Sequence, residues 1–439
     1  MIKEYLKYAI PSSFAMFISA LYTVIDGIFV GQGVGDNALA AINIVLPFTV
    51  MIIGIANMLA VGGGALVSKN IGLNETNKAV NIFRQVLKFL MILSISISLI
   101  SVIFTDSIVK MLGSTPNLQD LAVEYLRYYA IFSIPNLVGI VLNSFARNDN
   151  QPKLAMISTI AGAITNIVLD YIFIFVFDMG IKGAAIATGL GQIVTVAIIL
   201  PHFINKRGNL TFGNEKLEIS VIKDILSIGF PSFLSQISYS FIVLIHNMAI
   251  VNSMGENGIA AYSILNYVGT NIYMILFGLT LGVQPLISYN YGKQDEKTIL
   301  KFHKINLSVN LLVTTIYVIL TLALGDSVVS VFTNDSDVYK IGVMAVIIGS
   351  FANYMVGLNI ATIVYYQAIE MPKISTIVCL MRSIIFLPIS FIILINVFGP
   401  NGIWAGTLLS ETLTFMSINL VYNLKKYTNK SIERLTENI

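Results

Sequence analysis

The second half of the chain repeats the first half. When the sequence is shifted by 220 positions, Pro11 falls on Pro231 and Pro152 falls on Pro372. Further matched pairs are Gly35 with Gly255, Ser68 with Ser288, Asn70 with Asn290 and Gly72 with Gly292. One duplicated unit therefore makes up the whole protein, and a duplication of this size in an apolar chain is typical of membrane proteins built around a pseudo-symmetry axis.

The chain is too apolar for a soluble domain. Hydrophobic residues make up 56% of it and charged residues 11%, whereas a soluble domain has about 25% charged residues. The segments 38–68 and 257–292 contain no charged residue at all. Runs of this length predict membrane-spanning helices.

Each half divides into six such segments. The expected spans are 5–30, 38–67, 83–105, 122–146, 154–177 and 183–205, followed by 222–251, 257–287, 305–325, 338–368, 374–398 and 402–424. We therefore expect an all-α integral membrane protein with twelve transmembrane helices in two pseudo-symmetric six-helix lobes. The expected boundaries are 1–205 for the N-terminal lobe, 206–221 for a cytoplasmic linker and 222–439 for the C-terminal lobe.

The basic residues predict the orientation. If the N-terminus is cytoplasmic, most of the 26 Lys and Arg residues fall in cytoplasmic segments, including the tail after the last span. The exceptions are Lys110, Arg127, Lys182 and Lys340 on the outer side and Arg382 within a span. The positive-inside rule then places both termini in the cytoplasm of a plasma-membrane protein. The net charge of +3 mainly reflects this bias, so we expect no nucleic-acid partner.

The sequence contains none of the motifs of a soluble enzyme. Its loops are short, its lone Cys379 cannot form an internal disulfide, and no HExxH, CxxC, GxSxG or P-loop pattern occurs. We therefore expect neither an enzyme nor a cofactor. The run Gly62-Gly63-Gly64 and the series Gly27, Gly31 and Gly35 are interpreted as close contacts between helices.

Five ionisable side chains inside the expected spans are candidates for function, because a charge there is costly and is retained mainly for use. They are Asp26, Asp170, His246, Arg382 and Glu411. Counting from the inner ends of their helices, Asp26 and Asp170 both lie about 25–28 Å from the inner surface. The two acids are therefore expected at one depth in the N-terminal lobe.

Two neutral residues extend this acidic pair. Asn166 lies one helical turn before Asp170, and Thr188 lies near the start of a helix that descends from the outer side. The oxygen atoms of Asp26, Asn166, Asp170 and Thr188 suit a hard monovalent or divalent cation, Na⁺ among them. The acids could equally share a proton, because two close carboxylates repel each other when both are ionised. A purely structural alternative is that each acid caps a local helix break.

The duplication sharpens the interpretation of these residues. His246 lies opposite Asp26 and Ser390 lies opposite Asp170, so only one lobe has the acidic pair. A purely structural device would be expected in both lobes. For Arg382 two interpretations remain, snorkelling towards the inner surface or pairing with Glu411. His246 is expected to be either a hydrogen-bonded interior residue or a titrating one.

With these residues in view, the chain resembles the multidrug and toxic compound extrusion (MATE) transporters over essentially its whole length. The paired prolines, the glycine-rich turn after the first span, and the set Asp26, Asn166, Asp170 and Thr188 match the pattern of that family. The resemblance implies export of amphipathic, mostly organic-cation compounds in exchange for Na⁺ or H⁺. One branch of the family also uses acids in the seventh and tenth spans, and this chain has none in 231–251 or in 338–368.

We therefore expect an antiporter that works by alternating access of its two lobes. The coupling ion is expected to bind Asp26 and Asp170, and Pro11, which interrupts the backbone ladder of the first span, is expected to act as a hinge. A functional monomer is expected. A lipid-linked precursor flippase of the same superfamily is the alternative, although an anionic cargo would favour several basic residues within the spans. A membrane-embedded enzyme is a weaker alternative, because no catalytic constellation is visible.

Overall fold

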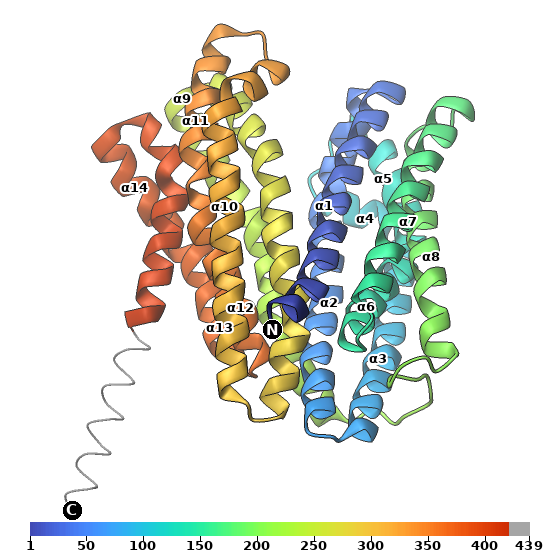
Figure 1. The fold of residues 1–439 in the computed structure, drawn as a ribbon. Helices are drawn as coiled ribbons and strands as arrows, with labels where there is room; N and C mark the ends of the chain where they lie inside the picture. Colours follow the sequence, from blue (N-terminus) through green and yellow to red (C-terminus); the bar gives the residue numbers. More distant parts are fainter. Residues whose placement is uncertain (421–439) are drawn as a thin grey trace, which may run out of the picture. The chain divides into compact units, whose positions relative to one another are not determined.

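The structure of the protein is a computed structural model, and it describes residues 1–420 (Figure 1). Within these residues the secondary structure is helical and contains no strand. The chain divides into two compact units. The first comprises Met1–Ile237, Met274–Asn306 and Val364–Pro372, and the second comprises Ser238–Tyr273, Leu307–Ile363 and the chain from Lys373 onwards.

The N-terminal half forms a helical bundle within the first unit. Its helices are α1 (Ile2–Gly33), α2 (Asp36–Gly72), α3 (Thr76–Ile103), α4 (Thr105–Met111), α5 (Pro116–Ile131), α6 (Ser133–Asn148), α7 (Pro152–Tyr171), the π-helical turn η1 (Ile172–Val176) and α8 (Ile181–Ile204). Helix α7 packs along α1 and α8, while α2 packs along α3, α5 and α6. The buried side chains of this bundle form one continuous apolar core.

The second half forms a similar series of helices, with its π-helical turn in the middle of a span. Its helices are α9 (Ile219–Gly292), α10 (Glu296–Phe332), α11 (Ser336–Ser350), α12 (Ala352–Ala368), α13 (Pro372–Leu380), the π-helical turn η2 (Met381–Ile385), α14 (Phe386–Phe398) and η3 (Pro400–Ala405), after which a helix runs from 406 to the end of the described residues.

The predicted twelve-helix fold is confirmed over the described part of the chain. Eight helices are long and apolar enough to cross a membrane, and two bent pairs, α5 with α6 and α11 with α12, bring the number to ten. Helix α9 supplies one more span because Gly255, with φ 64°, breaks it in two. The helix from 406 is the twelfth.

The fourth and tenth spans are not the uninterrupted helices 122–146 and 338–368 that the sequence predicted. The first bends by 50° at Phe132 and the second by 40° at Phe351. Pro135 lies in the first turn after Phe132, where its ring clashes with the carbonyl of Ile131 and removes a backbone hydrogen bond. At the second bend, Asn353 donates to the Ser350 carbonyl at 3.1 Å and replaces a backbone partner.

The prediction of close helix contacts at glycines is confirmed at Gly62 but not at Gly27 and Gly31. A Cβ on Gly62 would lie 2.0 Å from the carbonyl oxygen of Ile225, so this position requires glycine for close helix contact. By contrast, Gly27 and Gly31 face open space, and the prediction of a close contact there was wrong. Gly35 has φ 111°, a conformation that favours glycine at the turn between α1 and α2.

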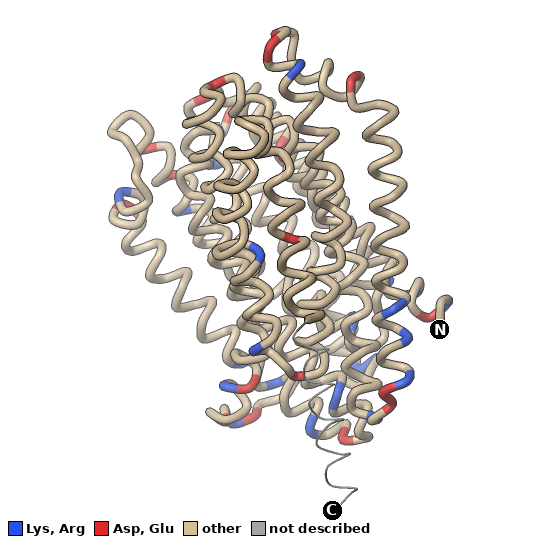
Figure 2. The backbone as a smooth tube through the Cα atoms, turned by 90° about the vertical axis from the view of Figure 1, so that its left-hand side faces the viewer, with Lys and Arg blue, Asp and Glu red and all other residues tan. Residues whose placement is uncertain are grey.

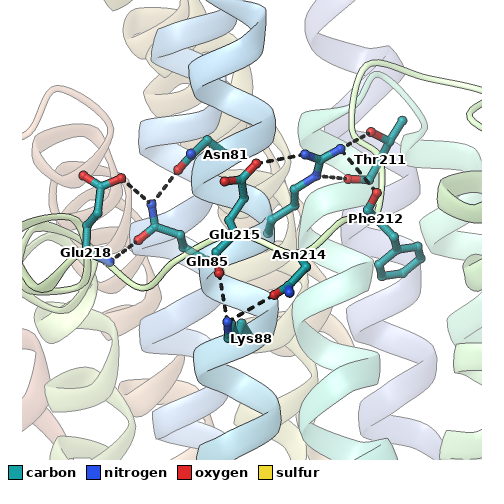
Figure 3. Close-up of polar contacts among 9 residues, drawn as sticks. Asn81, Gln85, Lys88, Thr211, Phe212, Asn214, Glu215 and Glu218 are labelled. Atoms are coloured by element: carbon teal, nitrogen blue, oxygen red, sulfur yellow. Dashed lines mark hydrogen bonds and ion pairs between the residues drawn. The ribbon is translucent and has the colours of Figure 1, made fainter.

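The segment between α8 and α9 is fixed to α3 (Figure 3). Arg84 donates to the Thr211 carbonyl and to the Glu215 carboxylate, both at 3.0 Å. Gln85 receives the backbone N–H of Glu218 at 2.8 Å and donates to its carboxylate at 3.3 Å. The start of α9 is therefore held on the N-terminal bundle by a folded strap.

Charged residues lie mainly at helix ends, and the Lys and Arg residues gather at one of those ends (Figure 2). In the first unit this end carries the end of α2, with Lys69, and the first half of α3, with Arg84 and Lys88. We call it the basic end. The predicted basic tail, with Lys425 and Lys430, lies outside the described residues.

Candidate cation site

The two acids of the N-terminal half come together. Asp26 lies on α1 and Asp170 lies on α7, immediately before the π-helical turn η1, and these two helices pack along each other. Each acid lies in the electrostatic environment of the other. Because two close carboxylates repel each other when both are ionised, a proton or a cation between them stabilises the pair.

Asn166 and Thr188 complete the group. Asn166 lies one turn before Asp170 on α7, and its Nδ2 donates to Thr188 Oγ1 on α8 at 3.3 Å. The close approach of α7 and α8 depends on two glycines. A Cβ on Gly162 would lie 2.7 Å from the Gly191 carbonyl oxygen, and one on Gly191 would lie 3.1 Å from Asn166 Cβ.

Several oxygen atoms of this group are buried and receive no hydrogen bond from the residues that the structure describes. Asp170 is 0% exposed and Asn166 is 2% exposed. No hydrogen bond reaches Asp26 Oδ1, Asn166 Oδ1 or either carboxylate oxygen of Asp170. Buried oxygens without partners are costly to a folded protein, and they are the ligands that a hard cation requires. The geometry therefore fits a cation, or a proton shared between the acids.

Three tyrosines that the sequence analysis did not single out line the same region. Tyr22 lies one turn before Asp26, and the electrostatic environment of Tyr22 and Tyr125 includes both acids. Tyr125 and Tyr129 on α5 stack on each other, and Tyr129 accepts from Asn136 at 3.0 Å. The spacing of four residues in each pair, Tyr22 to Asp26 and Tyr125 to Tyr129, places each pair on one helix face and was the available signal.

At the counterpart of this site in the second half, the polar groups of His246 have hydrogen-bond partners. His246 lies opposite Asp26, and its Nδ1 is 2.8 Å from the Ile242 carbonyl oxygen while its Nε2 is 3.1 Å from Thr407 Oγ1. Its ring stacks on Tyr262 and meets the edge of Phe391. Both ring nitrogens therefore have partners, as in a hydrogen-bonded interior histidine.

The alignment of the two halves explains the position of Thr407. Gly180 and Gly399 occupy equivalent turns in the two halves, with φ 61° and 67°. They are 219 positions apart, so the second copy has one residue fewer before this turn. Beyond that turn the halves align with a shift of 219, and Thr407 is the counterpart of Thr188. Asp26 with Thr188 thus corresponds to His246 with Thr407.

Arg382 and Glu411 pair with each other in the second unit. Arg382 Nε lies 2.8 Å from Glu411 Oε1, and Asn359 Nδ2 donates to Glu411 Oε2 at 2.6 Å. The residues are 8% and 1% exposed. The arginine therefore points to a buried partner and does not snorkel, and the pair is neutral as a whole.

Pro11 lies inside α1, buried, about 22 Å along the helix from Asp26 at 1.5 Å per residue. The segment around it contacts the second part of α9. A Cβ on Gly278 would lie 2.5 Å from Ser13 Cα, and one on Gly282 would lie 2.7 Å from the Tyr8 carbonyl oxygen. Helix α1 therefore connects the acidic pair to this contact.

Comparisons with known proteins agree with this architecture. A family model described as MatE matches residues 11–172 and 231–392, two blocks separated by the same shift of 220. The multidrug export protein MepA of Staphylococcus aureus (strain MSSA476) is 26% identical over 427 residues, which cover 96% of this chain and 93% of that protein. MepA of Staphylococcus saprophyticus is 23% identical over 424 residues, with the same coverage.

Solved structures share the fold. An outward-facing multidrug resistance MATE family transporter of the MOP superfamily has a TM-score of 0.92 and 24% identity, over 98% of this chain and 96% of its own. A MOP superfamily transporter from Pyrococcus furiosus Vc1, described as having a binding pocket of reverse polarity, has a TM-score of 0.90 and 23% identity, over 96% of this chain and 95% of its own. The resemblance to MATE transporters is confirmed, and the chain belongs to the MatE family of membrane transporters, which are not enzymes.

Proposed function

We propose that the protein is a cation-coupled antiporter that exports amphipathic, mostly cationic drugs and toxic compounds. Relatives that align over nearly their whole length are multidrug export proteins. The observation that carries the proposal is the acidic pair: Asp26 Oδ1 and both carboxylate oxygens of Asp170 are buried and receive no hydrogen bond from the described residues. Such a pair changes its interactions strongly when an ion binds, and that change is what coupling requires.

The coupling ion is the second substrate. Asp26 and Asp170 supply the charge, and Asn166 and Thr188 supply neutral oxygens that replace part of a hydration shell. A proton needs only one carboxylate, so the two neutral ligands favour Na⁺ over H⁺. If H⁺ is the coupling ion, Asn166 and Thr188 orient the carboxylates.

Transport then proceeds by alternating access of two lobes, 1–205 and 222–439, joined by the linker 206–221. Ion binding at Asp26 acts on α1, and Pro11 supplies the hinge by which this helix responds. The basic end faces the cytoplasm, together with both termini, in the plasma membrane. The functional unit is a monomer.

The flippase alternative is weaker. An anionic pyrophosphate cargo requires free positive charge within the spans, and Arg382 is neutralised by Glu411. In the proposed orientation, the other basic residues of the described segments fall on the cytoplasmic or the outer side.

The test is efflux of a cationic dye from reconstituted vesicles under separately imposed gradients. We expect an inward Na⁺ gradient at fixed pH to support efflux of ethidium. Efflux that follows only the pH gradient, at every Na⁺ concentration, would identify a proton site. Vesicles that export under neither gradient would exclude the antiporter.

A further inference from the structure

The two repeats touch at the basic end through a pair of glycines. A Cβ on Gly72, at the end of α2, would lie 2.0 Å from the carbonyl oxygen of Tyr289 on α9. A Cβ on Gly292, at the end of α9, would lie 2.0 Å from the carbonyl oxygen of Lys69 on α2. These two contacts are related by the shift of 220, and both lie within the first unit. The helix ends therefore meet backbone to backbone.

Similar contacts continue from this point along the helices. Besides Gly62 with Ile225, a Cβ on Gly229 would lie 1.9 Å from the Met58 carbonyl oxygen. In the matched position of the other repeat, Gly278 and Gly282 meet α1 near Ser13 and Tyr8. We call the contacts made by Gly62, Gly72, Gly229, Gly278, Gly282 and Gly292 the glycine seam. No side chain fits between the repeats along it.

One ion pair crosses between the repeats beside the seam. Lys69 Nζ lies 2.5 Å from Glu370 Oε2, and the two side chains are 29% and 20% exposed. Lys69 is the residue whose carbonyl oxygen Gly292 approaches. The ion pair therefore joins α2 of the first repeat to the turn between α12 and α13 of the second repeat.

The backbone at Glu370 indicates that this side chain has a specific task. Glu370 has φ 58°, in the left-handed region, where Asn is tolerated far better than Glu. Its counterpart Asn150 has φ 64° and accepts from Lys7 at 2.7 Å and Tyr8 at 2.9 Å, within its own repeat. Glu370 takes the less favourable backbone and reaches the other repeat instead.

We propose that the ion pair between Lys69 and Glu370 is a latch that holds the glycine seam closed. Resting on the proposed function, the latch shuts the cytoplasmic entrance while the transporter is open to the outside, and it must separate before cargo enters from the cytoplasm. The ends of α2 and α9 then part, and seam residues such as Ser12, which is 4% exposed in the closed seam, come into contact with water.

The test measures how often the seam opens, without reference to transport. Ser12 is changed to Cys in a Cys379→Ala background, and the purified protein in detergent is alkylated with a polyethylene-glycol maleimide. Detergent makes the assay independent of membrane orientation. Glu370→Gln is expected to raise the alkylation rate about two- to fivefold, the effect of losing one half-exposed ion pair.

Two further variants give the matched controls. Lys293→Gln removes a neighbouring basic side chain that makes no ion pair with Glu370, and it is expected to leave the rate unchanged. The exchange Lys69→Glu with Glu370→Lys is expected to restore the parent rate. Equal alkylation rates in the parent and Glu370→Gln would overturn the latch, and so would an exchange variant that alkylates as fast as Glu370→Gln.

Dye efflux separates this proposal from the proposed function. Vesicles that fail to export under any gradient, while alkylation behaves as expected, would overturn the antiporter and leave the latch supported. Normal efflux with unchanged alkylation would overturn the latch alone.

Discussion

The acidic site of the first repeat and its counterpart in the second repeat share a backbone arrangement but differ in their charged residues. In the first repeat, Asp26 Oδ1 and both carboxylate oxygens of Asp170 are buried and receive no hydrogen bond from the described residues. In the second repeat, His246 has both ring nitrogens paired, and Arg382 neutralises Glu411. Glycines at close backbone contacts, such as Gly72 and Gly292, are the same in both repeats. The charged residues inside the spans differ between the repeats, and this difference suggests that they serve function and not the fold.

The strongest test of this comparison removes charge from each repeat in turn. Asp26→Asn and Asp170→Asn should each reduce gradient-driven dye efflux to the level of protein-free vesicles, because the ion no longer has a charged ligand pair. His246→Gln should retain efflux, because Gln replaces the hydrogen-bonding groups of a neutral ring. Efflux rates at equal protein density provide the measurement.

Asp178→Asn is the matched control for these acids. Asp178 is exposed, it follows η1, and its φ of 50° is tolerated by Asn. The Asp178→Asn variant should export dye at the parent rate. Unimpaired efflux in both Asp26→Asn and Asp170→Asn would refute the ion site in the first repeat. Loss of efflux in His246→Gln would extend the site to the second repeat.

The charge pair of the second repeat should matter for stability and not for coupling. Arg382→Met leaves Glu411 buried without a neutralising partner and should cost about 3–5 kcal/mol. The double variant Arg382→Met with Glu411→Leu should recover most of that loss, because no charge remains buried. Thermal unfolding in detergent measures both. A double variant that is stable but transports without ion dependence would show that the pair takes part in coupling.

Much of this arrangement could be predicted from the sequence, and the reasons are physical. Membrane spans are long apolar runs, and the duplication made their number and order certain. Asp26 and Asp170 were found because a charge within a span is conspicuous. The bends at Phe132 and Phe351 were missed, because each depends on one local change in backbone hydrogen bonding. Pro135 removes a backbone hydrogen bond at the first bend, and the Asn353 side chain donates to a backbone carbonyl at the second. The latch was missed as well, because Lys69 and Glu370 are ordinary loop-end charges until folding brings them together.

A smaller effect separates the two threonines. Thr188→Ala removes the hydroxyl that contacts Asn166 and should raise the Na⁺ concentration for half-maximal efflux about two- to tenfold, the effect of one lost polar contact. Asn166→Ala should act in the same direction. Thr407→Ala, in the second repeat, should leave the Na⁺ dependence unchanged. If both threonine variants shift it equally, the two repeats contribute equally to ion binding.

The smallest expected effect concerns two equivalent helix starts. Asp335 caps α11 by accepting from the N–H groups of Asp337 and Val338 at 2.9 and 3.0 Å, whereas its counterpart Thr115 makes no such bond before α5. These bonds to the ionised carboxylate lower the pKa of Asp335. Its stabilising contribution is therefore present above the ordinary pKa of aspartate and is lost as the pH falls through the lowered value. Asp335→Ala should reduce thermal stability slightly at neutral pH, and the difference from the parent should vanish on acidification. Thr115→Ala should show no such pH dependence. If both variants lose the same thermal stability, the side-chain cap does not distinguish the two helix starts.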